Sequence, residues 1–202
     1  MRRPALHPVL RTRRRLLQAA LGATAALAMA GRAAASNAAA GVAGVAAPPE
    51  VAAEVPGAQL QGSGLLRFLG LRVYDARLWT AKAVDGSSWV NAPLALELIY
   101  ARKLVGRLIA ERSLEEMRRQ GEIPAEAGAR WLADMTRMFP DVAQGDRITG
   151  VLRPGQGSRF FVNGRAVGDV ADAEFSRLFF GIWLSARTSE PGLRDALLGR
   201  AR

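Results

Sequence analysis

Two stretches of the chain alternate apolar and polar residues in the way that half-buried β-strands do. Residues 62–82 contain the longest such run, and residues 94–102 contain a second one. A spacing of two residues places one set of side chains on each face of a strand. The alternation of the first stretch changes phase near Gly70 and again at Val73 and Tyr74. Because the phase cannot change without an extra residue, we expect a bulge or kink at each point and a single curved strand.

The turn-forming residues 86–88 lie between the two stretches, so we expect these stretches to pair as antiparallel neighbours. The predicted cross-strand pairs are Leu78 with Leu96, Ala76 with Leu98, Tyr74 with Tyr100 and Arg72 with Arg102 on one face, and Arg77 with Glu97 on the other. The first face is then an apolar column that ends in two phenols and two guanidinium groups. Because like charges are unfavourable opposite each other, we expect Arg72 and Arg102 to recruit an acidic neighbour or an anion.

The first 35 residues have the organisation of a cleaved export signal. Residues 1–15 carry six arginines and no acid, residues 16–30 are uncharged and rich in Ala and Leu, and residues 33–35 are small enough for a signal peptidase site. The uncharged core is shorter than the roughly 20 residues of a membrane-spanning helix. We therefore expect a periplasmic or secreted mature protein without a transmembrane anchor, with a retained anchor as the alternative. Residues 12–18 also resemble the twin-arginine export motif, so this route and the general route both stay open.

Removal of residues 1–35 takes away seven arginines and lowers the formal net charge from +10 to +3. The remaining arginines are spread singly, which does not favour a nucleic-acid partner. Residues 36–55 are rich in Ala, Gly and Pro, and we expect a disordered lead-in there. Residues 56–202 are long enough for one domain with a single core.

Two absences narrow the possible chemistry. The chain has no Cys, and its one His is His7, inside the predicted signal. The mature protein therefore lacks the usual ligands of zinc and copper sites and any Ser-His or Cys-His nucleophile pair. We expect no metal and no cofactor, and a function that depends on Arg, Lys, Tyr, Asp, Glu and hydroxyl groups.

The rest of the chain predicts helices and one further hairpin. Residues 103–120 and 124–139 read as helices, and a capping box of Ser113 with Glu116 is expected to restart or tighten the first one. Residues 146–153 and 158–162 read as a hairpin. A last long helix is expected after the capping residue Asp172, followed by a short closing helix over residues 189–198. The sheet-facing residues of the long helix that begins after Asp172 are predicted to be Phe175, Leu178, Phe179, Ile182 and Trp183.

Several segments resemble the exported bacterial branch of the chalcone isomerase-like proteins. They are GSGLLRFLGLRVYDARLW, LALELIYAR, GDRITGVLRPGQGSRFFVNG and EFSRLFFGIWLSARTSEPGLRDALLG, in the same order over nearly all of residues 56–200. The resemblance implies an α+β fold: an open-faced sandwich in which a large curved antiparallel β-sheet carries a layer of helices on one face. It also implies a ligand cleft between the two layers.

That family contains isomerases that close a chalcone to a flavanone and non-catalytic members that bind fatty acids. The resemblance implies five catalytic positions, of which only the arginine is present here, as Arg67. The other four fall near Leu69, Ile109, Glu116 and Ile182, where the enzymes have Thr, Tyr, Asn and Thr. We therefore expect the fold without the reaction.

The sequence predicts a slot for a small amphipathic carboxylate such as a fatty acid. The predicted ligand-binding residues are Arg67, Arg72, Tyr74, Tyr100 and Arg102. Guanidinium groups pair with carboxylates through two parallel hydrogen bonds, and the leucines would receive the apolar tail. Three alternatives stay open: tyrosines in the core with solvated arginines, an isomerase acting on chalcone-like or other enones, and an envelope accessory protein without a small ligand.

Overall fold

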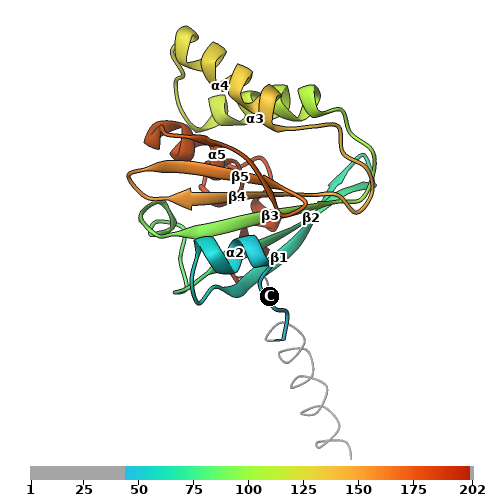
Figure 1. Cartoon of the computed structure of the whole chain (residues 1–202), viewed down its shortest axis with the longest axis vertical. Helices are drawn as coiled ribbons and strands as arrows, with labels where there is room; N and C mark the ends of the chain where they lie inside the picture. Colours follow the sequence, from blue (N-terminus) through green and yellow to red (C-terminus); the bar gives the residue numbers. More distant parts are fainter. Residues whose placement is uncertain (1–43, 201–202) are drawn as a thin grey trace, which may run out of the picture. The chain divides into compact units, whose positions relative to one another are not determined.

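The computed structural model describes residues 44–200, and the predicted export signal lies outside this range. A six-stranded antiparallel sheet with the strand order β1-β2-β3-β4-β5-β6 forms the centre of the described part (Figure 1). The strands are β1 (Gln59–Phe68), β2 (Leu71–Thr80), β3 (Leu94–Tyr100), β4 (Arg147–Arg153), β5 (Gly157–Val162) and β6 (Arg165–Val170). The helices are α2 (Pro49–Glu54), α3 (Gly106–Gln120), α4 (Ala125–Met138), α5 (Ala173–Leu184) and α6 (Pro191–Leu197), and a short 3-10 helix spans Trp89–Asn91. The predicted α+β architecture is confirmed. Within residues 44–200, no helix is both long enough and apolar enough to cross a bilayer.

The first alternating stretch forms two strands, so the prediction of one curved strand is wrong. A two-residue turn at Leu69 and Gly70 joins β1 to β2, and Phe68 pairs with Leu71 directly before and after it. Both turn residues have positive φ, 50° and 79°, as a tight hairpin turn of the primed type requires. The second phase change is a bulge, as predicted, because Val73 has no partner in β1.

The predicted register of β2 and β3 is confirmed at Tyr74 with Tyr100 and at Arg77 with Glu97. The predicted pair of Arg72 with Arg102 is wrong. Strand β3 ends at Tyr100, and the bulge at Val73 shifts the alternation so that Arg72 lies opposite Arg67 of β1. Arg72 has instead recruited the acidic neighbour expected for it, since its Nε donates to Oδ1 of Asp75 at 3.2 Å.

Helix α5 packs against the sheet, and α3 and α4 lie over it on the same side (Figure 1). The predicted face of α5 is confirmed, because all five residues predicted for it are buried. Phe180 and Leu184 of the same helix are buried as well. Helix α3 is continuous, so the predicted capping box is wrong: Ser113 lies inside the helix, where its Oγ donates to the carbonyl of Ile109 at 2.8 Å. Helix α6 reaches the backbone of β1 closely, and a Cβ at Gly62 would lie 2.3 Å from two of its carbonyl oxygens.

Helix α2 lies on the other face of the sheet, within the segment predicted to be a disordered lead-in. That prediction is wrong for the described residues 49–55. Val51 and Val55 pack with Trp79 and Val151 in a second, smaller apolar cluster. The two glutamates of α2 bind arginines of the sheet, and the clearest pair joins Glu54 Oε2 to Arg153 Nε at 3.1 Å. Apolar burial and ion pairing together make α2 part of the fold.

Candidate functional site

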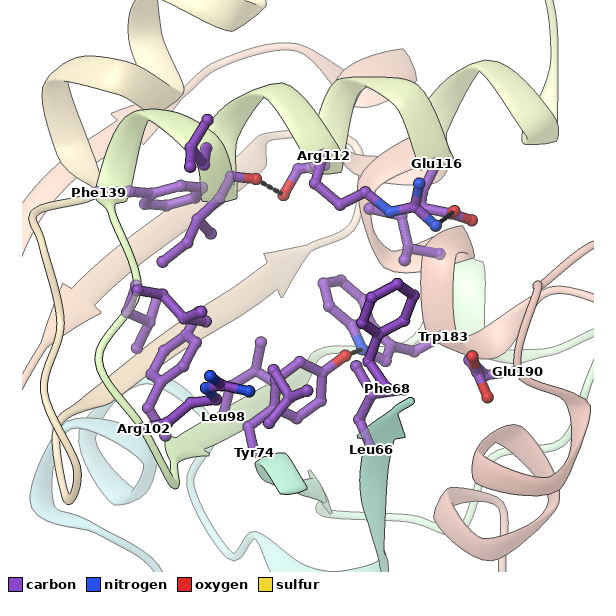
Figure 2. Close-up of a pocket in the computed structure, with 18 of the residues that line it drawn as sticks. Leu66, Phe68, Tyr74, Leu98, Arg102, Arg112, Glu116, Phe139, Trp183 and Glu190 are labelled. Atoms are coloured by element: carbon purple, nitrogen blue, oxygen red, sulfur yellow. Dashed lines mark hydrogen bonds and ion pairs between the residues drawn. The ribbon is translucent and has the colours of Figure 1, made fainter. Parts of the chain in front are cut away.

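A cavity of about 430 Å³ lies between the first strands of the sheet and helices α3 and α5 (Figure 2). Its lining is mostly apolar. On the sheet side the lining includes Leu66, Val73, Tyr74, Leu98, Tyr100 and Ile148, and on the helix side Leu108, Ile109, Phe179, Ile182 and Trp183. The sheet contributes its helix-facing residues, and the bulge at Val73 adds one more side chain to this face. The cleft that the resemblance implied is therefore present.

Both tyrosines of the predicted site line this cavity. Their rings meet edge to face with centroids 6.0 Å apart. The hydroxyl of Tyr74 accepts a hydrogen bond from Nε1 of Trp183 at 2.9 Å. Burial raises the pKa of the Tyr74 phenol and also that of the Tyr100 phenol. Both groups therefore stay protonated at neutral pH.

Two of the three predicted arginines are at the cavity. Arg67 comes from the end of β1 and Arg102 from the residues that follow β3, and both side chains are exposed at the rim. Within residues 44–200, neither forms an ion pair, and Arg67 donates only to the carbonyl of Gly70 at 3.3 Å. Arg72 does not line the cavity, because the bulge at Val73 places it outside. Four of the five predicted ligand-binding residues thus lie together.

Helix α3 adds a carboxylate, Glu116, which was predicted to form a capping box with Ser113 and which falls near an implied catalytic position. Glu116 lines the cavity and is only 4% exposed. Its carboxylate forms ion pairs with Nη2 of Arg112 at 2.5 Å and with Nε of Arg119 at 3.3 Å, although neither contact has hydrogen-bond geometry. The spacing of these residues, four and three apart on a helix, was a signal available in the sequence. Figure 2 shows Arg112 and Glu116 on α3, across the cavity from Tyr74 and Arg102.

The arrangement favours binding over catalysis. Among the five implied catalytic positions, Arg67, Ile109, Glu116 and Ile182 line the cavity, whereas Leu69 lies in the exposed turn of the β1–β2 hairpin. Two of the lining positions carry alkyl side chains, and the one acid is held in ion pairs. No group of three potential metal ligands is brought together within residues 44–200. The cavity offers an apolar body, phenol hydroxyls and rim guanidinium groups.

The fold and the cavity define an α+β open-faced sandwich with an internal apolar site. The family model described as chalcone isomerase-like matches residues 39–199, so the chain belongs to the chalcone isomerase-like family. No curated protein matches the sequence. Among solved structures, a fatty-acid binding protein of Arabidopsis thaliana is similar, with a TM-score of 0.57 and 16% sequence identity, over 77% of this chain and 92% of that one. At this identity the likeness shows a shared fold.

Proposed function

We propose that the protein is an exported, non-catalytic member of its family that binds a small amphipathic carboxylate, such as a fatty acid, in the cavity between sheet and helices. The observation that carries this proposal is an apolar cavity with two arginines at its rim that have no ion-pair partner among the described residues. A volume of about 430 Å³ falls in the range of small-molecule sites. The similarity of the fold to a fatty-acid binding protein supports the same conclusion.

The apolar lining and the rim arginines suit the two parts of such a ligand. An alkyl tail placed between the leucines of the sheet and the apolar face of α3 removes apolar surface from water, at roughly 25 cal/mol per Å². A carboxylate at the rim meets Arg102 or Arg67, and a charge-assisted hydrogen bond forms without breaking an existing ion pair. The phenols of Tyr74 and Tyr100 lie beneath this rim and can orient the bound molecule.

Material purified from its natural source tests the ligand and the export together. Mass spectrometry of extracted lipid should find a fatty acid or a related carboxylate, and the intact mass should show a chain that begins between residues 31 and 36. A chain that still begins at Met1 would contradict the proposed export. An absence of any amphipathic ligand would contradict the binding proposal.

The replacement Arg102→Met tests the role of the arginine at the rim of the cavity. Methionine keeps much of the packing of the arginine stem but removes the charge, so the affinity for laurate should fall about tenfold to a hundredfold, the equivalent of about 1.5–3 kcal/mol. Isothermal titration calorimetry, in which laurate is added to the delipidated protein, measures this change in affinity. The control is Arg165→Met, which removes an exposed arginine of β6 that does not line the cavity. Equal affinities of the two variants would overturn the assignment of Arg102.

A further inference from the structure

Large apolar side chains are exposed around the mouth of the cavity. The β1–β2 hairpin contributes Phe68, Leu69 and Leu71, which are 66%, 86% and 56% exposed, and the start of α3 adds Val105 and Leu108. We call these five residues the apolar rim. Phe68, Val105 and Leu108 also line the cavity, so the exposed surface and the interior are continuous. Clusters of exposed apolar side chains of this kind mark contact sites.

Leu69 is costly to the fold in its present position. It occupies the first central position of the hairpin turn with φ 50°, where Asn or Gly is favoured and a bulky side chain is rare. Its side chain is almost fully exposed, so packing within the described residues does not offset the cost. Backbone conformations of this kind often lie at functional sites. A leucine here places an apolar group at the outermost point of the hairpin.

Positive charge accompanies the apolar rim. Arg67 and Arg102 line the cavity mouth without ion pairs among residues 44–200, and the exposed Lys103 follows directly in the chain. Glu190 also lines the cavity without an ion-pair partner in the same range, so the cations exceed the acid. Apolar side chains that protrude between cations are the pattern of segments that enter the surface of an anionic bilayer.

We infer that the apolar rim inserts into the surface of an anionic lipid bilayer, so that an amphipathic ligand passes between membrane and cavity without crossing water. Membrane insertion needs only a few side chains together with attraction between the cations and lipid phosphates. The inference extends the proposed function, but vesicle binding can be measured without any ligand.

Site-directed spin labels on the full chain test this inference, because the sequence has no Cys and a single introduced one is unique. Nitroxide at Leu71→Cys probes the rim, and nitroxide at Val167→Cys on β6, at the other edge of the sheet, is the control. With vesicles of equal parts phosphatidylglycerol and phosphatidylcholine, we expect the label at position 71 to be shielded from a water-soluble nickel complex. The label at position 167 should stay accessible. Both labelled proteins contain residues 1–35, so these residues do not cause a difference in shielding between the two labels.

Two substitutions outside the cavity lining then give the magnitude. Leu69→Asn fits the turn better, so the fold should persist, while the lipid concentration for half-maximal shielding at position 71 should rise about tenfold or more. Lys103→Gln should raise this lipid concentration about fivefold with the anionic vesicles. With vesicles of pure phosphatidylcholine, the same substitution should not change it. Both variants should bind laurate normally in solution.

An accessible label at position 71, or equal shielding at both positions, would overturn the inference. Sedimentation without vesicles distinguishes a further outcome. A dimer that Leu69→Asn dissociates would show that a second copy of the chain covers the rim and would also overturn it. If the apolar rim does not insert into vesicles but the protein still binds laurate, the membrane inference is wrong and the proposed function is not contradicted.

Discussion

The carboxylate of Glu97 is 1% exposed and lies on the sheet face that is turned away from the cavity. It accepts a hydrogen bond from Nε1 of Trp79 at 3.0 Å. Two guanidinium groups approach it, Arg147 with its Nε at 3.4 Å and Arg77 with its Nη1 at 3.7 Å. Arg147 also binds Glu50 of α2 at 2.8 Å, so one buried acid links three strands and, through this arginine, a helix. A buried carboxylate is tolerated only when it has partners of this kind.

We expect Glu97→Gln to lower the free energy of unfolding by about 1–3 kcal/mol, because it leaves two guanidinium groups without their shared charge partner. The control is Glu115→Gln, which removes an exposed ion pair with Arg112 and should cost about 0–1 kcal/mol. Unfolding in urea, monitored by tryptophan fluorescence, measures the free energy of unfolding of both variants. Equal effects of the two variants would show that the buried network contributes nothing beyond a surface pair.

The contact of Arg77 with Glu97 could be predicted from the sequence because β2 and β3 have patterned residues on both faces. A register that satisfied the apolar column also placed these two charges opposite each other. The position of Arg72 could not be predicted in the same way. One unpaired residue at Val73 reverses the faces beyond it, and the sequence shows where the phase changes but not which residue lies outside the pairing.

Helix α5 depends on its first turn. The side chain of Asp172 accepts hydrogen bonds from the backbone N–H groups of Glu174 and Phe175, each at 3.0 Å, and from Nε1 of Trp131 of α4 at 3.0 Å. Burial alone would raise the pKa of this carboxyl, but these hydrogen bonds outweigh it and lower the pKa below its ordinary value. One side chain therefore caps α5 and joins it to α4.

We expect Asp172→Ala to lower the free energy of unfolding by about 2 kcal/mol at neutral pH, because the cap and the partner of Trp131 are both lost. A pKa that is lower in the folded state gives stability that is present above the ordinary value of about 4 and is lost as pH falls through the folded-state pKa. The difference from the unsubstituted protein should therefore shrink below pH about 4. Thermal unfolding across pH checks this, with Glu122→Ala, an exposed position, as the control. A difference that does not change with pH would contradict the role of the ionised cap.

Helices and strands with strong local sequence signals were predicted correctly, and those without such signals were missed. The cap at Asp172 and the apolar spacing of α5 predicted that helix, and the glycine-containing turn predicted the hairpin of β4 and β5. Helix α2 has six residues in an Ala-rich segment, and its partners are distant in sequence, so no local pattern indicated it. The turn at Leu69 was missed because leucine is not a turn-forming residue.

At the scale of the whole molecule, the cavity that the resemblance implied is present, but most of the implied catalytic positions have other residues. We expect no cyclisation of chalcone above the spontaneous rate, because four of the five implied catalytic positions have Leu, Ile or Glu. Burial raises the pKa of both phenols at the cavity, so they stay protonated at neutral pH. The decrease of chalcone absorbance with and without protein measures the rate. A rate well above background that disappears in Arg67→Met would show that an isomerase activity persists.

The division of the sheet into two faces bears on how such a protein can change over evolutionary time. Along β2, β3 and β4, the residues Leu78, Leu96 and Leu152 face the helices, while Trp79, Ala95 and Val151 face α2. The side chains that would select a ligand and the network around Glu97 that binds α2 therefore occupy alternate positions of the same strands. Substitutions on one face leave the contacts of the other in place. A lineage can thus exchange one ligand for another, or lose a reaction, by steps that each preserve a folded protein.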